Sequence, residues 1–131
     1  MPLKPIRPDP NANPPGFLIA KDDDWSISVL PPHNKEDGPP VRANGMTVGI
    51  LEMASDAPHN GEMHPDGDEF LHVISGEVQV SCDSQPEIVT VGPGESCIIS
   101  KGEWHNVHIN VPTKLIHITP GPGGEHRPLS A

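Results

Sequence analysis

The stretch that decides the fold is "GEMHPDGDEFLHVISGE", residues 61–77, in which acids and histidines run directly into an apolar segment. Glu62 and His64 are two residues apart, so on an extended strand their side chains point to the same face. A proline and a glycine then allow a turn, and Glu69 opens the next strand. Such a concentration of acids beside a histidine indicates either a charged loop or a metal site.

Outward from this stretch, apolar and polar residues alternate with a period of two, which predicts strands rather than helices. The runs are short and are separated by turn signals such as Ser75-Gly76 and Pro93-Gly94. This pattern is typical of an antiparallel sandwich or barrel. The expected strands are residues 25–30, 46–54, 68–75, 77–82, 87–91, 96–100, 105–110 and 113–119.

The length of 131 residues suits one domain. Prolines are concentrated in residues 1–16, which predicts an extended or disordered N-terminal arm. Residues 17–119 are expected to form the single folded domain. Glycines and prolines in residues 120–131 predict a flexible C-terminal tail.

The chain is acidic, with 18 Asp and Glu against 8 Lys and Arg and a formal net charge of −10. A field of that sign repels nucleic acid and anionic membrane surfaces, so neither is an expected partner. The N-terminus lacks the apolar core of a secretory signal, and no apolar run approaches the roughly 20 residues that span a bilayer. The expectation is a soluble cytoplasmic protein, with Cys82 and Cys97 as buried free thiols.

A second histidine-bearing segment, "GESCIISKGEWHNVH", residues 94–108, follows downstream. If the barrel brings His105 opposite Glu62, His64 and Glu69, two imidazoles and two carboxylates converge. This mixed nitrogen and oxygen set suits one divalent transition metal: Fe, Mn, Zn or Ni. Inward-facing carboxylates without a cation would be costly to bury, so the pattern favours a metal site.

These residues resemble the two motifs of the cupin superfamily, G(x)5HxH(x)3,4E(x)6G and G(x)5PxG(x)2H(x)3N. The matching positions are His64, Glu69 and Gly76 in the first motif and Gly94, Gly102 and His105 in the second. The resemblance spans about residues 46–119. It implies an all-β, cupin-type double-stranded β-helix (jelly-roll) barrel, here with a Pro-rich arm. It also implies a metal, a small-molecule ligand and a homodimer formed through one sheet. The Pro-rich arm of this chain could cross to the partner in such a dimer.

The chain departs from the motifs at Asp56, Glu62, Ser100 and Ile109, which replace a glycine, a histidine, a proline and an asparagine. A carboxylate at position 62 makes the site harder, which favours Mn(II), Fe(II) or Zn(II). Alternatively, Glu62 does not ligate and is the general base of a three-ligand site. Glu52 is a second candidate base, although a surface position at the end of its strand is an equal alternative.

Other polar residues near the motifs have less specific interpretations. His59 is expected in an exposed loop, with a fifth-ligand or substrate-contact role as the alternative. His108 is out of phase with His105 and is expected to face away. His72 and His117 are expected at the surface or an interface. Asp66 is expected to shape the turn, or else to replace Glu62 as a ligand.

The resemblance alone does not select an activity, because cupins carry many. The first hypothesis is a metal-dependent enzyme of oxygenase, isomerase or lyase type acting on a small polar organic molecule. The alternatives are a non-catalytic metal- or ligand-binding sensor module and a metal-free barrel. Tyrosine is absent and only two Phe and two Trp occur, so a pocket that stacks large planar substrates is disfavoured.

Overall fold

The computed structural model describes residues 2–31, 34 and 43–129, and within them it contains strands and turns but no α-helix. That part of the chain therefore holds no helix able to span a membrane. The strands are β1 (Gly16–Lys21), β2 (Ile27–Val29), β3 (Met46–Met53), β4 (Glu62–Met63), β5 (Glu69–Ser75), β6 (Val78–Cys82), β7 (Gln85–Val91), β8 (Ser96–Ile99), β9 (His105–Ile109), β10 (Thr113–Pro120) and β11 (Glu125–His126).

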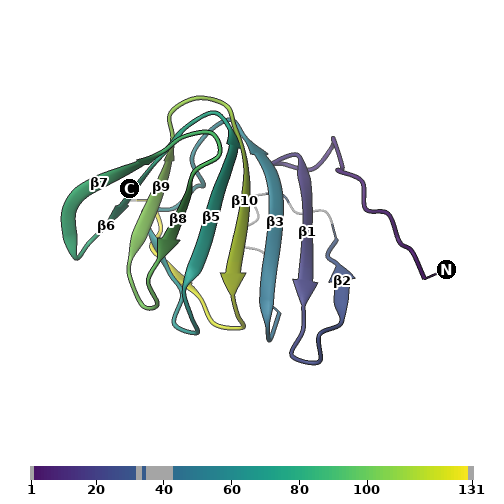
Figure 1. Ribbon diagram of the computed structural model, residues 1–131. Coiled ribbons are helices and arrows are strands. Elements are labelled where there is room, and N and C mark those ends of the chain that lie inside the picture. Colours follow the sequence, from purple (N-terminus) through teal and green to yellow (C-terminus); the bar gives the residue numbers. More distant parts are fainter. Residues whose placement is uncertain (1, 32–33, 35–42, 130–131) are drawn as a thin grey trace.

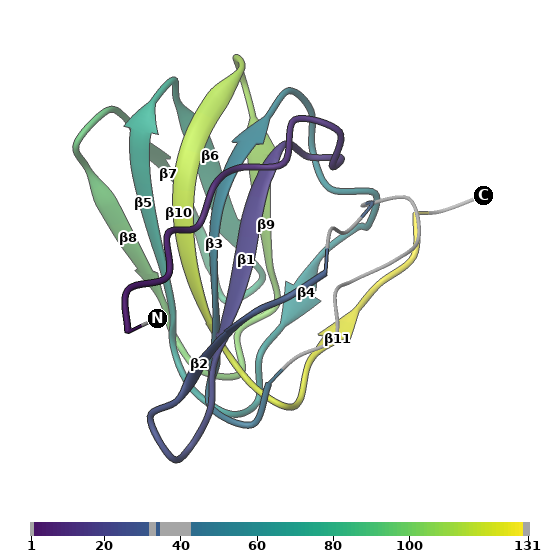
Figure 2. The ribbon, with the colours of Figure 1, turned by 90° about the vertical axis from the view of Figure 1, so that its right-hand side faces the viewer.

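The strands form two antiparallel sheets that face each other (Figures 1 and 2). One sheet has the order β2-β1-β3-β10-β5-β8 and the other β11-β4-β9-β6-β7. From β3 onward the chain passes back and forth between the two sheets, except at the β6–β7 hairpin, as in a double-stranded β-helix. The predicted all-β jelly-roll barrel is confirmed.

The core lies between the two sheets, where alternate residues of each strand point inward. On β5, for example, Leu71 and Val73 are buried whereas Ile74 on the opposite face is exposed. The buried cluster consists of Leu71, Val73, Val78, Val80, Val91, Ile99 and Leu115. Because one sheet face is apolar and inward, the register of β5 is fixed, and Glu69 points inward with Leu71 and Val73.

Gly76 makes the turn between β5 and β6 with a positive φ of 89°. A Cβ atom at this position would overlap the Thr113 hydroxyl and the Pro112 carbonyl oxygen. The Thr113 Oγ1 also accepts a hydrogen bond from the Glu77 backbone N–H at 3.1 Å. A glycine is therefore required for both backbone conformation and space.

Three strands were not expected from the sequence. β1 contains four consecutive apolar residues, so it shows no period of two, and β4 and β11 are too short for any periodicity. β11 lies within residues 120–131, the segment expected to be a tail, and pairs with β4. Residues 130 and 131 of that tail and residue 1 of the expected arm lie outside the described residues.

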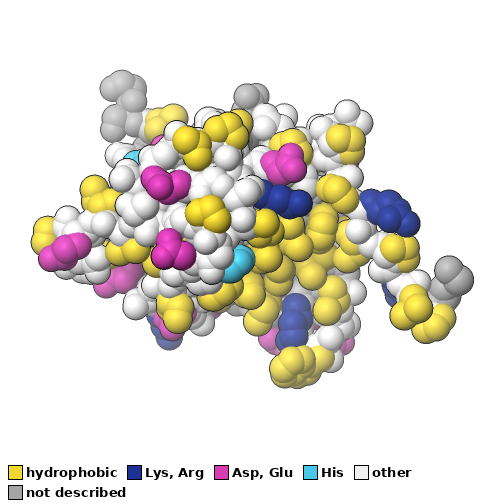
Figure 3. Space-filling model, turned by 45° about the horizontal axis from the view of Figure 1, so that its top comes forward, with side chains coloured by type: hydrophobic (Ala, Val, Ile, Leu, Met, Phe, Trp, Pro, Cys, Tyr) yellow, Lys and Arg dark blue, Asp and Glu magenta, His cyan; other side chains and the backbone are white. Residues whose placement is uncertain are grey.

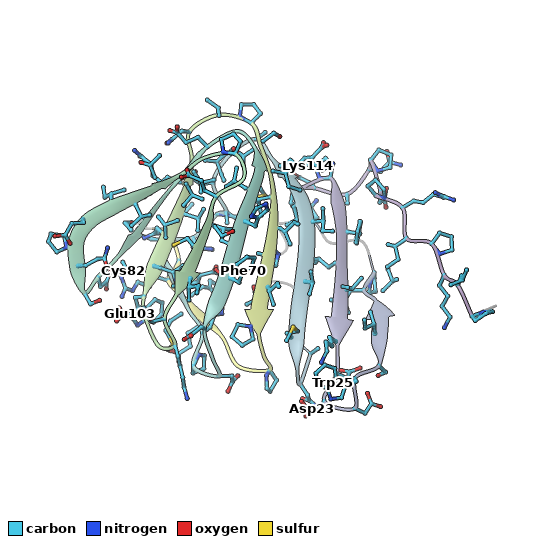
Figure 4. The ribbon with its side chains drawn as sticks, viewed as in Figure 1. Asp23, Trp25, Phe70, Cys82, Glu103 and Lys114 are labelled. Carbon is cyan, nitrogen blue, oxygen red and sulfur yellow. The ribbon has the colours of Figure 1, made fainter. Side chains whose placement is uncertain are left out.

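The arm before β1 runs away from the edge of the barrel beyond β2 (Figure 1). Its last part is tied to the barrel, because the Asp9 N–H donates to the Gly16 carbonyl at 3.1 Å. The Glu52 N–H also donates to the Pro15 carbonyl at 2.9 Å. The β1–β2 hairpin that follows carries Trp25 at its tip (Figure 4).

Hydrophobic side chains also gather on the outside of the molecule, over the region of β10, β3 and β1 (Figure 3). Further along this sheet, Ile98 on β8 is 69% exposed and Ile74 on β5 is 41% exposed. Phe70, labelled in Figure 4, lies on the same sheet and its ring stacks on His72 at 6.5 Å between centroids. The outer sheet face is thus unusually apolar for a surface in contact with water.

Candidate metal centre

Four side chains from both sheets converge at one end of the barrel. Glu62 lies on β4 and is the cross-strand partner of His105, the first residue of β9. Glu69 is the first residue of β5, and His64 lies in the turn between β4 and β5. One ligand atom from each of the four residues lies within 4.8 Å of the others.

The two imidazoles face the two carboxylates. His64 Nε2 is 3.1 Å from Glu69 Oε2 and 3.5 Å from Glu62 Oε1. His105 Nε2 is 3.4 Å from Glu69 Oε1 and 3.5 Å from Glu62 Oε1. His64, Glu69 and His105 are at most 5% exposed, whereas Glu62 is 21% exposed. The predicted set is therefore brought together, with Glu62 as its most accessible member.

Hydrogen bonding at His105 decides which ring nitrogen faces the carboxylates. Nδ1 donates to the backbone carbonyl of Glu103 at 3.0 Å, in the connection between β8 and β9 (Figure 4). With the proton held on Nδ1, Nε2 is the atom that takes up a further proton or binds a cation. The Nε2 atoms of both His64 and His105 are buried without a hydrogen-bond partner among the described residues. Two imidazole nitrogens that face two carboxylates at 3.1–3.5 Å without a well-aligned hydrogen bond fit a divalent cation.

The histidines and carboxylates of the cluster stabilise each other's charged forms, which burial alone would disfavour. Burial acts to lower the pKa of both histidines, but contacts with Glu62 and Glu69 outweigh it and raise the pKa to about 9 for His64 and about 10 for His105. Burial acts to raise the pKa of Glu69, but the two histidines outweigh it and lower the pKa to about 2. They also hold the pKa of Glu62 well below its ordinary value. The two carboxylates thus call for two positive charges, which two protons or one divalent cation would supply.

A cavity of about 340 Å³ opens beside the cluster, and both Glu62 and Glu69 line it. Most of its wall is aliphatic, contributed by strands of both sheets. These apolar residues are Leu18, Leu51, Met53, Leu71, Val107, Ile109 and Leu115. Its remaining polar side chains include three histidines, His59, His117 and His126, and the arm adds Arg7 and Asp9. The carboxylates therefore stand where a small bound molecule would reach them.

His59 contacts the outer oxygen of Glu62. Its Nδ1 accepts a hydrogen bond from the Gly61 N–H at 3.1 Å, which leaves the proton of the neutral ring on Nε2. Nε2 lies 3.6 Å from Glu62 Oε2, and burial lowers the pKa of His59 below its ordinary value, which favours the neutral ring. The prediction of an exposed loop histidine is wrong here, because the loop folds His59 into the cavity wall.

Two further residues lie on faces that the sequence left open or did not predict. Of the two alternatives for Glu52, the surface position is the one observed, because the side chain is exposed on the outer face of β3 and does not line the cavity. His117 was expected at the surface, but it shares the inward face of β10 with Leu115 and lines the cavity.

The remaining polar residues have structural roles. His108 is exposed and contacts Asp56 at 3.1 Å, away from the cluster as expected. Asp66 accepts the Gly123 N–H at 2.5 Å, which ties the β4–β5 connection to the segment before β11, and it is not in the cluster. Cys82 and Cys97 are free thiols, half-buried rather than buried.

Thr119, His117 and His126 were not identified from the sequence as site residues. Thr119 and His117 lie two residues apart on β10, so the period of two in the sequence predicts that they share a face with Leu115. What the sequence did not reveal is that this face lines the same cavity as Glu69. His126 lies opposite Glu62 on β11, a strand too short to be predicted.

Comparison with known proteins agrees with this architecture. A family model described as "Cupin domain" matches residues 49–119. The chain belongs to the cupin family. No curated protein matches it.

Solved cupin-like structures share the fold at low sequence identity. An uncharacterised Klebsiella pneumoniae protein with a double-stranded β-helix domain is 21% identical with a TM-score of 0.53, over 70% of this chain and 86% of its own. A cupin-2 domain protein from Shewanella frigidimarina is 22% identical with a TM-score of 0.51, over 61% and 74%. A Bacillus halodurans protein is 26% identical with a TM-score of 0.51, over 66% and 72%.

The cupin motifs are held together by the backbone in this chain. The N–H of Gly102, in the second motif, donates to the carbonyl of His64, in the first, at 3.0 Å. Two of the departures from the motifs also meet, because Asp56 Oδ1 accepts the Ile109 N–H at 2.6 Å. The Asp56 carboxylate thus links the two motif segments through a bond that a glycine could not make.

Proposed function

We propose that this cupin is a metal-dependent enzyme that binds one divalent ion of Fe, Mn, Zn or Ni through Glu62, His64, Glu69 and His105. The observation that carries the proposal is the convergence of four potential ligand atoms, one from each of the two imidazoles and two carboxylates, within 4.8 Å of one another at one largely buried place. Imidazole and carboxylate together are the donor set of such metals. When bound, the metal supplies a Lewis acid that polarises an oxygen of the substrate.

The cavity supports an enzyme more than a closed binding site. Glu62 and Glu69 both line it, so the centre is reached from a space that accepts a small molecule. The aliphatic wall excludes water from that space and packs against apolar groups of the occupant. Glu62 is proposed as a ligand rather than a base, since its pKa lies well below the neutral range that suits a base.

The charges and the lining together suggest the kind of substrate. Two carboxylates balance one divalent ion, so the loaded centre attracts anions weakly. The arm contributes both Arg7 and Asp9 to the cavity lining, so it adds no net charge that would select an anion. A small aliphatic molecule with an uncharged oxygen group, such as a ketone, aldehyde or alcohol, is therefore the proposed substrate class. The activity would be of oxygenase, isomerase or lyase type.

We also propose a homodimer formed through the apolar outer face of the six-stranded sheet. The exposed Ile74 and Ile98 and the neighbouring Phe70 support it. The start of the arm, where Leu3 is 81% exposed, is proposed to reach across such an interface.

The test of the metal centre is a calorimetric titration of chelator-stripped protein with Zn(II) and Mn(II). Wild type is expected to bind one equivalent, and His105→Ala to bind at least about tenfold more weakly, because one of four ligands is lost. His108→Ala is the matched control, since that histidine is exposed and outside the cluster. Equal affinity in wild type and His105→Ala would reject the centre.

The substrate class is tested with 2-hexanone and hexanoate, which share an aliphatic chain and differ in head-group charge. Titrated into the metal-loaded protein, 2-hexanone is expected to bind more tightly. Tighter binding of hexanoate would show that the centre selects anions, contrary to the proposal.

A further inference from the structure

Glu69 is held by a hydroxyl group from the neighbouring strand. Thr119 Oγ1, on β10, donates to Glu69 Oε2 at 2.7 Å. Both side chains are buried, with Thr119 0% and Glu69 5% exposed. In this bond the Thr119 hydroxyl is the donor and the Glu69 carboxylate the acceptor. The single proton of the Thr119 hydroxyl therefore points to Glu69.

The direction of this hydrogen bond determines which ring nitrogen of a second residue, His117, carries a proton. His117 Nδ1 lies 2.8 Å from the same Thr119 Oγ1. Since the hydroxyl has no second proton to give, its oxygen must accept here, and Nδ1 of His117 must carry the proton. A directed chain results, from His117 Nδ1–H to the Thr119 oxygen and from the Thr119 O–H to Glu69.

The position of the His117 ring is built into the sheet. Its cross-strand neighbour on β3 is Gly49, and a Cβ atom at Gly49 would overlap His117 Nε2. The missing side chain of Gly49 thus gives the imidazole room to lie against β3 on the inward face. There His117 forms part of the cavity wall.

We infer that Thr119 and His117 are positioning residues for Glu69 and connect the cavity wall to the metal centre. This inference rests on the proposed function, because it assigns the chain a role in presenting a metal ligand. The hydrogen bond from Thr119 restrains rotation of the Glu69 carboxylate, and His117 in turn orients the Thr119 hydroxyl. Partners of this kind orient metal ligands and contribute about 10- to 100-fold in metal affinity.

The first part of the test uses Thr119→Val, which keeps the shape of the side chain without the hydroxyl, and Thr119→Ser, which keeps the hydroxyl. Zn(II) affinity is expected to fall at least about tenfold in Thr119→Val and to stay within about threefold of wild type in Thr119→Ser. The Co(II)-substituted Thr119→Val protein is expected to show a shifted visible spectrum, a change that a merely structural role would not produce. Equal affinities and spectra in the two variants would overturn the inference.

The second part uses the near-isosteric pair His117→Asn and His117→Leu, of which only Asn can donate to Thr119. We expect Asn to retain the metal affinity and Leu to lower it about threefold or more. Equal affinity in both would overturn the role of His117. This pair also serves if Thr119→Val fails to fold.

The third part needs no metal. Nitrogen-15 NMR of the metal-free protein is expected to show a proton on Nδ1 of His117. An unprotonated Nδ1 would overturn the chain. If wild type binds Zn(II) but the Val and Ser variants do not differ, only this inference fails. If wild type binds no metal, the proposed function fails and the inference fails with it.

Discussion

Metal binding is expected to release close to two protons at pH 7. The pKa values of His64 and His105 in the metal-free protein are raised to about 9 and about 10, so both rings are protonated at neutral pH. Each ring must lose the Nε2 proton to bind a cation, whereas Glu69, with a pKa of about 2, is already ionised. Two protons per metal imply that affinity rises about 100-fold per pH unit between pH 5 and 8.

The number of protons is measured by calorimetry of Zn(II) binding at pH 7 in buffers of different ionisation enthalpy. The slope of observed enthalpy against buffer enthalpy gives the protons released, and we expect a value near two. His108→Ala should give the same slope, because that ring is exposed and far from the carboxylates of the cluster. Release of less than about half a proton would refute the exchange of two protons for one metal ion. An affinity that does not change between pH 5 and 8 would refute it as well.

Three other measurements follow from the structure. The metal-free protein should have its highest melting temperature between pH 4.5 and 6.5. Stability from the raised histidine pKa values is fully present below their ordinary 6.5 and lost as pH rises towards about 10. Stability from the lowered Glu69 pKa is present above its ordinary 4.5 and lost towards about 2, so a maximum near pH 9 would contradict the charge pattern. Gly76→Ala should lower the free energy of unfolding in urea by more than about 1 kcal/mol, because φ at this position is positive and Thr113 and Pro112 fill the space that a Cβ would need. An unchanged urea midpoint would refute this requirement for glycine. Deletion of residues 1–8, which leaves the Asp9–Gly16 bond, should weaken the homodimer in light scattering, and an unchanged mass would remove the arm from the interface.

The strands of the barrel core could be predicted from the sequence because one of their faces is buried. On β6, Val78 and Val80 point inward and alternate with polar Gln79 and Ser81, so the period of two is visible. β1 was missed because its outward residues are also apolar, which hides the alternation. β4 and β11 were missed because two-residue strands depend on their neighbours rather than on local pattern.

The four candidate ligands could be predicted because motif spacing fixes their place at the ends of strands. The residues around them could not, because their roles depend on which strands become neighbours. Thr119 meets Glu69 only because β10 pairs with β5. The two alternatives for Glu52 could not be decided from the sequence for a related reason, since alternation alone does not say which face of β3 is the inner one.

The most direct test of the account is elemental analysis of untagged protein purified without chelators. The account predicts about one equivalent of iron, manganese, zinc or nickel in wild type, its loss in His105→Ala and its retention in His108→Ala. Loss in Glu62→Ala as well would place that carboxylate among the ligands. A wild-type protein that holds no metal, even after reconstitution with each of the four ions, would contradict the central claim.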